Sequence, residues 1–205
     1  MAAEITSVDS IVHRYSNYDT PLWARPNSQP GRWHRVGDGP TQYTALTTDG
    51  AWAELIRNEE LTSESEVSLV RIPMWAIKVT DSLIVDYSTF ETAEAAGFNP
   101  DALVDDDYDQ AQQEGARLRD AGYHGVLAPS AALPGEVNLT LFGPRVIASW
   151  GRPPLLASSL SATIIATGSP PAGLLPRARR LGEPHRGLQD HRARRLAGPD
   201  GTDGR

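Results

Sequence analysis

The sequence predicts an α+β domain over residues 1–150, followed by a segment of a different kind over residues 151–205. Two observations predict the fold class: several short apolar segments have the composition of strands, and two clear helical patterns do not alternate strictly with them. A third observation sets the boundary, because all 14 aromatic residues (5 Trp, 6 Tyr and 3 Phe) lie before residue 151.

Charge changes at the same boundary. Residues 1–150 contain 10 basic and 22 acidic side chains, whereas residues 151–205 contain 9 basic and 4 acidic ones. The whole chain has a formal charge of −7 and no cysteine. An acidic domain argues against nucleic acid as a partner, because binding to phosphates requires clustered Lys and Arg. The absence of cysteine excludes disulfide bonds, a thiolate metal site and a cysteine nucleophile.

The first third of the domain carries two expected strands and one helix. Residues 11–15 and 42–46 are apolar or aromatic with alternating polar neighbours, a pattern typical of strands. Between them, residues 21–40 contain four Pro and three Gly, which predicts an extended, turning connection. Asp49 is then expected to cap a helix over residues 51–60.

The rest of the domain is predicted to add five strands and a second helix. The strands are expected over residues 67–72, 74–79, 83–86, 125–128 and 137–142. The helix is expected over residues 109–121, with Gly122 as the residue that follows its last turn.

Four aspartates precede or begin this second helix, and they have two interpretations. They are Asp105, Asp106, Asp107 and Asp109. Grouped carboxylates are potential Ca²⁺ ligands, but the Gly and the terminal Glu of an EF-hand loop are missing. Negative charges are also favoured at a helix N-terminus by its dipole. We therefore interpret them as helix-terminus residues.

Residues 151–205 have the composition of a disordered, low-complexity tail. They contain 15 Gly or Pro and an arginine-rich stretch over residues 177–195. Such a composition is expected to bury too little apolar surface to offset chain entropy. Two alternatives stay open: a nucleic-acid-binding arm, since arginine clusters attract phosphate, and a frameshifted reading of a GC-rich gene.

No membrane or secretion signal is expected. The N-terminus lacks the basic and apolar regions of a signal peptide. The most apolar candidate, residues 155–166, is about twelve residues long and contains four hydroxyl side chains. A membrane-spanning helix needs ~20 apolar residues, so we expect a soluble cytoplasmic protein without a membrane partner.

Candidate site residues start at Arg32, within the densest group of cationic and aromatic residues, 31–35. Its guanidinium suits phosphate oxygens, and Gly31 allows the backbone to approach a ligand. Eleven residues later comes Tyr43 on an expected strand, and eleven later again Glu54 on an expected helix. These groups suit a pyrophosphate, a planar ring and a cationic sugar. Alone, they equally fit a surface ion pair, a core tyrosine and a solvated helix residue.

Two other chemistries find little support. His13, His34 and His124 lack the paired spacing of a metal site, so no metal is expected. Ser130 lacks the flanking glycines of a hydrolase nucleophile elbow, so it is not expected to act as a nucleophile.

Six segments, taken in order, make the chain resemble the RES domain family, bacterial toxins named for an Arg, a Glu and a Ser. The segments are His13-Arg14-Tyr15, Gly31-Arg32-Trp33-His34, Thr41-Gln42-Tyr43-Thr44-Ala45, Ala51-Trp52-Ala53-Glu54, Ala128-Pro129-Ser130-Ala131 and residues 138–145. Arg25 and Arg35 lie nearby, but the family pattern places the functional arginine directly after the glycine, at Arg32.

The resemblance implies an ADP-ribosyltransferase-like fold with a central twisted, mainly antiparallel β core and flanking helices. It also implies an enzyme that cleaves the nicotinamide–ribose bond of NAD⁺, with phosphate or water as acceptor. The implied partner is a helix-turn-helix (Xre-type) antitoxin that blocks the site, and a homodimer is possible. Two alternatives stay open: transfer of ADP-ribose to a protein, and a non-catalytic member that only binds its antitoxin.

The resemblance also assigns roles to three catalytic residues. Glu54 would stabilise the positive charge that develops on the ribose, an interaction stronger in the transition state than in the ground state. Arg32 would hold the pyrophosphate of NAD⁺. Tyr43 would stack on the nicotinamide or shape its pocket.

Three further residues are implied to bind the substrate. Arg14 would hold the pyrophosphate together with Arg32. Ser130 would hydrogen-bond the ribose or the carboxamide. Asn138 would have an orienting role.

Overall fold

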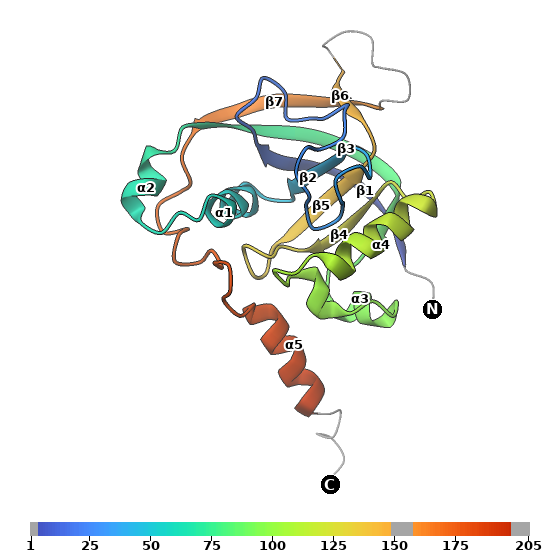
Figure 1. The fold of residues 1–205 in the computed structure, drawn as a ribbon. Coiled ribbons are helices and arrows are strands. Elements are labelled where there is room, and N and C mark those ends of the chain that lie inside the picture. Colours follow the sequence, from blue (N-terminus) through green and yellow to red (C-terminus); the bar gives the residue numbers. More distant parts are fainter. Residues whose placement is uncertain (1–3, 149–157, 198–205) are drawn as a thin grey trace.

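The longest strand, β3 (Ile72–Asp86), organises the fold because three other strands pair with it (Figure 1). The computed structural model describes residues 4–148 and 158–197. β1 (Ile5–Tyr15) runs antiparallel along one edge of β3. On the other edge, β7 (Ser158–Gly168) pairs antiparallel with the first half of β3, and β4 (Gly125–Pro129) pairs parallel with its end.

Two more strands close these pairings into a ring. β2 (Thr41–Ala45) pairs with β1, and β5 (Val137–Phe142) pairs with both β2 and β4, in each case antiparallel. The order β1-β2-β5-β4-β3 therefore returns to β1, while β7 and β6 (Arg145–Ile147) extend the sheet outside the ring. The prediction of a mainly antiparallel core with flanking helices is confirmed.

Fully buried aliphatic side chains hold the strands together. They are Val12 on β1, Ile77 and Ile84 on β3, and Leu139 and Leu141 on β5. On β1 the side chain before Val12, Ile11, is exposed, as expected from the alternation of side chains along a strand.

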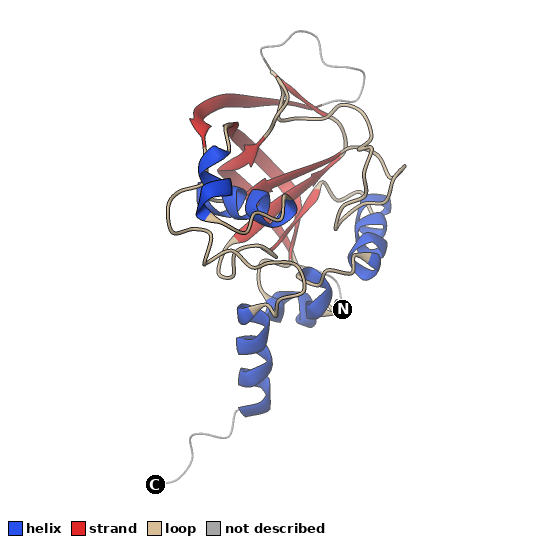
Figure 2. Cartoon of the chain, turned by 60° about the vertical axis from the view of Figure 1, so that its left-hand side comes forward, coloured by secondary structure: helices blue, strands red, loops and turns tan. Residues whose placement is uncertain are grey.

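Helices flank the strands on different sides (Figures 1 and 2). The described helices are α1 (Thr48–Asn58), α2 (Glu64–Leu69), α3 (Phe90–Ala95), the 3₁₀ helix η1 (Pro100–Leu103), α4 (Asp109–Asp120) and α5 (Arg186–Ala197). None of the helices in residues 4–148 and 158–197 combines the length and apolarity needed to cross a membrane.

Helix α1 matches the expected helix, except for its cap. Thr47 is the N-cap, because its side chain accepts a hydrogen bond from the Gly50 amide. Asp49 lies instead in the first turn, where the helix dipole favours a negative charge. The buried face of α1 includes Leu55 and Ile56.

The expectation of a strand over residues 67–72 is wrong, because residues 67–69 belong to α2 and β3 begins only at Ile72. Ser63 and Glu66 form a capping box, in which each side chain accepts a hydrogen bond from the other's backbone amide. Val67 is buried whereas Leu69 is exposed, which does not follow the alternation of a strand. The expected strands over residues 74–79 and 83–86 are both parts of β3, whose pairing with β1 continues between them.

The expectation of a disordered tail does not hold for residues 158–197. β7 completes an edge of β3, and Leu174 and Leu175 are buried against α1. The composition showed only that this segment has few apolar residues. It did not reveal that these few meet a complementary surface, or that the arginines meet carboxylates of the domain. Residues 149–157, where the expected domain boundary falls, and 198–205 lie outside the described residues.

Candidate active site

A cavity of about 400 Å³ opens between β1, β2, β5, the end of β4, helix α1 and the Pro/Gly-rich connection before β2. Five of the six residues singled out in the sequence line it. They are Arg14, Arg32, Tyr43, Glu54 and Asn138. Residues as distant in the chain as Arg14 and Asn138 thus meet in one wall, because the ring of strands brings β1, β2 and β5 side by side.

Glu54 lies on α1 with its carboxylate held from two sides. Its Oε1 accepts a hydrogen bond of 2.8 Å from the Ser130 hydroxyl and one of 2.6 Å from the Asn138 side-chain amide. No residue in the described ranges donates a hydrogen bond to Oε2. One carboxylate oxygen is therefore used to fix the orientation of the group, and the other is available to a ligand.

Ser130 lies behind Glu54 and not in the cavity wall. It is fully buried, and its hydroxyl accepts hydrogen bonds from the amides of Ala132 and Leu133 while donating to Glu54. These three bonds occupy the donor and both lone pairs of a hydroxyl group. The structure therefore gives Ser130 a contact with the carboxylate in place of the expected contact with ribose or carboxamide.

Asn138 faces Ala45 of β2 and Ala128 of β4, which leaves room for its side chain to reach Glu54. Its Oδ1 is buried and has no hydrogen-bond partner among the described residues. A buried amide oxygen without a partner is costly, so Oδ1 is an acceptor for a donor group of a ligand. This position fits the orienting role expected for Asn138.

Tyr43 lines the cavity while its hydroxyl is bound elsewhere. The hydroxyl accepts a hydrogen bond of 2.9 Å from the Trp33 amide and shares one of 2.8 Å with His34 Nδ1. Burial raises the pKa of Tyr43 far above its ordinary value, so the phenol stays neutral. A Cβ atom at Gly31 would lie 2.5 Å from the Tyr43 hydroxyl oxygen, so only glycine fits beside it.

Arg14 is a largely desolvated cation on β1. Its Nη1 is buried without a partner among the described residues, and its guanidinium lies 5.3 Å from the centre of the Trp23 ring. Burial lowers its pKa to about 10, so it remains protonated at neutral pH. A buried cation with unused donors is suited to an anionic ligand.

Arg32 is anchored at one nitrogen. Nη1 donates to the carbonyl oxygens of Asp105, at 2.6 Å, and Ala102, at 3.3 Å. The guanidinium lies 4.7 Å from the centre of the Tyr108 ring. Arg32 lines the cavity, whereas Arg25 and Arg35 do not.

Arg57 is a cavity residue that the sequence reasoning missed. It is almost completely buried, its Nη2 donates to Asp106, and its Nη1 has no partner among the described residues. The available signal was its spacing from Glu54, because positions i and i+3 share one face of a helix. Asp106 is thus bound in an ion pair. Of the four aspartates, only Asp109 lies in the first turn of α4, so the interpretation as helix-terminus residues holds for Asp109 and not for Asp106.

The histidines are dispersed. His13 lines the cavity with both ring nitrogens buried and unpartnered among the described residues, and burial lowers its pKa. His34 binds Tyr43, and His124 pairs with Asp81. Across residues 4–148 and 158–197, no group of three or more His, Asp or Glu side chains has the arrangement of a metal site.

The fold and the cavity together define a mixed α and β protein with a preformed site for an anionic ligand. In the described part of the chain, three guanidiniums and one carboxylate line this site. The RES domain family model matches residues 8–154, and the chain belongs to that family. The family assignment made from the sequence is confirmed.

Two proteins from Mycobacterium tuberculosis are among those similar to this chain. One is named a probable NAD(+) phosphorylase and is 34% identical over 125 residues, or 58% of this chain and 56% of the relative. This chain therefore spans about half the length of that relative. The other is a chain in the crystal structure of the MbcT–MbcA toxin–antitoxin complex, with a TM-score of 0.64 and 22% identity over 81% of this chain and 87% of that one. At that identity the likeness concerns the fold.

Proposed function

We propose that this protein is an NAD⁺-degrading toxin that cleaves the nicotinamide–ribose bond, with phosphate as the preferred acceptor. The observation that carries the proposal is the carboxylate of Glu54, fixed by Ser130 and Asn138 in a cavity that three guanidiniums also line. The name of the similar mycobacterial phosphorylase supports the same reaction.

The carboxylate supplies the electrostatic part of the reaction. As the bond from the ribose C1 to the nicotinamide nitrogen breaks, nicotinamide leaves as a neutral molecule and positive charge develops on the ribose. Glu54 Oε2 interacts with this charge more strongly in the transition state than in the ground state. Because Ser130 and Asn138 already hold Oε1, the carboxylate needs no reorganisation when the charge appears.

The guanidiniums bind the anionic parts of the substrates. Arg14 and Arg32 would hold the pyrophosphate, and the Tyr43 ring would pack on the nicotinamide. Arg57, one turn of α1 beyond Glu54, would bind the acceptor phosphate through its unused Nη1. Attack of a phosphate oxygen on C1 then yields ADP-ribose phosphate and nicotinamide. Because nicotinamide leaves as a neutral molecule, no general acid is required. The cavity volume lies within the ~300–1,000 Å³ range of small-molecule sites.

The same proposal extends to the partner, the fold class and the cellular location of this protein. The solved structure that this chain resembles is that of a toxin–antitoxin complex, which supports a cognate antitoxin for this chain, and we propose that it is of the helix-turn-helix type. We further propose that the ring of strands and its helices form an ADP-ribosyltransferase-like fold. A cytoplasmic location follows from the availability of NAD⁺ there, and a homodimer is compatible with the proposal.

The test is release of nicotinamide from NAD⁺ by the purified chain. Glu54→Gln removes the charge but keeps the size, so the rate should fall by roughly 10²- to 10³-fold, as for other electrostatic catalytic groups. Glu59→Gln is the matched control, because Glu59 is exposed at the end of the same helix and does not line the cavity. Its rate should be unchanged. An equal rate in Glu54→Gln and wild type would refute the proposed site.

The products distinguish the acceptors. With phosphate present, ADP-ribose phosphate should accumulate, and the rate should rise with phosphate concentration. Free ADP-ribose at all phosphate concentrations would indicate water as the acceptor. Covalent label on a lysate protein after incubation with labelled NAD⁺ would indicate protein ADP-ribosylation instead.

A further inference from the structure

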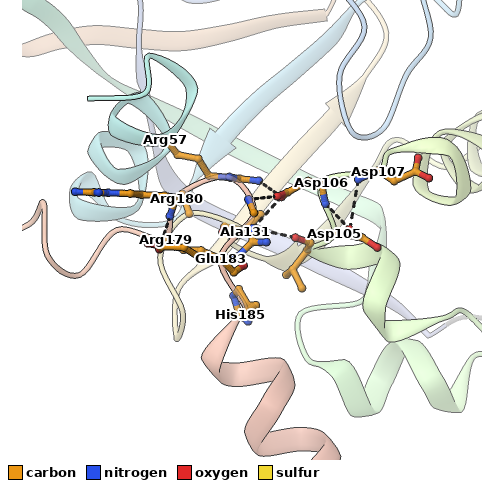
Figure 3. A network of polar contacts seen from close by, with 12 residues as sticks. Arg57, Asp105, Asp106, Asp107, Ala131, Arg179, Arg180, Glu183 and His185 are labelled. Atoms are coloured by element: carbon orange, nitrogen blue, oxygen red, sulfur yellow. Dashed lines mark hydrogen bonds and ion pairs between the residues drawn. The ribbon is translucent and has the colours of Figure 1, made fainter. Parts of the chain in front are cut away.

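The turn between β7 and α5 (residues 169–185, the C-terminal turn) contacts Ala131 of the cavity lining through Arg179, although it follows every cavity residue in the chain (Figure 3). Its side chains Leu174, Leu175 and Ala178 are buried in the same apolar cluster as Leu55 of α1. Helix α1 carries Glu54 and Arg57. This C-terminal turn therefore packs against the helix that supplies two of the site's charged groups.

Arg179 is the buried cation of this turn, and its guanidinium contacts four acceptors. Nε donates to the Glu183 carbonyl oxygen at 2.6 Å. Nη1 lies 3.1 Å from Asp106 Oδ1, 3.2 Å from the Val104 carbonyl oxygen and 3.4 Å from that of Ala131. A buried cation is stable only when it is paired and hydrogen-bonded, and these acceptors meet that requirement.

Asp106 connects Arg179 to the cavity. Its Oδ1 accepts hydrogen bonds from Arg57 Nη2, at 2.5 Å, and from Arg179, while Oδ2 accepts from the Gly182 amide at 2.6 Å. Burial alone would raise the pKa of Asp106, but the Gly182 amide and the two arginine charges outweigh it and lower that pKa. The ionised carboxylate is thus held by the C-terminal turn on one side and holds Arg57 on the other.

A second connection reaches the turn that supports Glu54. The Arg179 backbone amide donates to the Ala132 carbonyl oxygen at 2.7 Å. His185 Nδ1 accepts a hydrogen bond from the Leu188 amide, so its Nε2 carries the proton and donates to the Ser130 carbonyl oxygen at 3.0 Å. The backbone on both sides of Ala131 is therefore bonded from behind.

We propose that the C-terminal turn is part of the functional site and that Arg179 is a positioning residue, which acts through Asp106 to orient the Arg57 guanidinium toward the cavity. What Arg57 binds there rests on the proposed function, whereas the coupling of Arg179 to Arg57 does not. Without Arg179, Asp106 keeps its bond to Arg57 but loses one of the groups that fix its own position. Arg57 then no longer presents Nη1 in a single orientation.

The kinetic test is a double-mutant cycle in the full chain. Arg179→Met should lower kcat/KM by up to about 100-fold, since small displacements of a positioned group have effects of that size, and should raise the KM for phosphate more than the KM for NAD⁺. In an Arg57→Met background, Arg179→Met should change kcat/KM less than about twofold, because groups acting through one another are not additive. Additive losses in the two backgrounds would overturn the proposal.

A second readout needs no activity. In NMR spectra of the arginine side chains, the Arg57 Nε–H resonance, assigned by its loss in Arg57→Lys, should shift in Arg179→Met. The matched control is Arg177→Met, because Arg177 forms only an exposed ion pair with Asp49. An Arg57 resonance unmoved by Arg179→Met would overturn the proposal, even if the wild type never consumed NAD⁺.

A separate control tests whether each variant folds. Arg179→Lys keeps the buried charge but cannot replace the Nε and Nη1 bonds together. It should fold and reproduce the Arg57 shift in weaker form. Thermal unfolding of each variant identifies one that fails to fold. If Arg179→Met does not fold, the kinetic cycle and the NMR spectra are measured with Arg179→Lys instead. Additive losses of kcat/KM or an unmoved Arg57 resonance would then overturn the proposal.

Discussion

Different forces hold the ring of strands together and attach helix α5 to the rest of the protein. The strands of the ring are joined through fully buried aliphatic side chains. Helix α5 contacts α3 and η1 through three ion pairs, Arg192 with Asp101, Arg194 with Glu91 and Arg195 with Glu94. Its apolar contribution is Leu188, which is buried in one cluster with Phe90 of α3. The difference shows that the basic C-terminal segment and the acidic domain are complementary surfaces of one molecule.

This complementarity revises the interpretation of the net charge. Three of the seven arginines that suggested a nucleic-acid arm pair with carboxylates of α3 and η1, and two more, Arg177 and Arg179, pair with Asp49 and Asp106. His191, a buried residue of α5, also pairs with Glu91 and Glu94. The charge imbalance along the sequence therefore reflects contact between the two segments.

The largest expected effect concerns the ring. Leu139→Ala removes a fully buried side chain of β5 and should lower the free energy of unfolding by about 2–5 kcal/mol. The matched control is Leu196→Ala on α5, whose side chain is 90% exposed. It should change stability by less than about 0.5 kcal/mol. Chemical denaturation measures both, and similar values for the two would remove the distinction between the regions.

Acidification should affect α5 before the ring. Hydrogen bonds from His191 and then Arg194 lower the pKa of Glu91 to about 2. A carboxyl group with a lowered folded-state pKa stabilises the fold above its ordinary value, near 4.5, and loses that contribution as pH falls through about 2. Half of the Glu91 side chain is exposed, so solvent screens the effect.

Hydrogen exchange, corrected for its intrinsic pH dependence, measures this order. The amides of α5 should lose protection between about pH 4.5 and pH 2 while those of β5 remain protected. High salt at pH 7 should act in the same direction, because it screens exposed charges. Simultaneous loss of protection in both elements would contradict separate attachment.

The smallest expected effect is that of a single ion pair. Arg194→Ala should lower the free energy of unfolding by less than about 1 kcal/mol, the usual range for exposed pairs. The measurement is again chemical denaturation. A loss as large as that of Leu139→Ala would show that α5 docks as firmly as a core strand.

Local patterns predicted the elements that depend on nearby residues. Helix α4 with Gly122 after it, and strands β2, β4 and β5, lie within a few residues of their expected positions. The tail and α2 were misjudged for different reasons. Residues 158–197 of the tail are ordered by partners that are distant in the sequence. Helix α2 begins with a capping box, whereas the apolar residues Val67 and Leu69 at alternate positions had suggested a strand.

The residues of the candidate site also divide into those that the sequence predicted and those that it did not. Family motifs identified the residues that line the cavity, such as Glu54 and Tyr43. They did not identify Arg57, which is bound by an aspartate 49 positions later in the chain. The spacing from Glu54 could have placed Arg57 on the same face of α1, but no local pattern could show an ion pair with a partner so distant in the chain.

The late position of Arg179 has a consequence for synthesis of the protein. On the ribosome, Glu54, Tyr43 and Asn138 all emerge before the turn that supports their surroundings. A nascent chain therefore carries the cavity residues well before the site is braced. For a protein proposed to consume NAD⁺, this order delays full competence until the turn that ends at His185 has left the ribosome and packed behind α1.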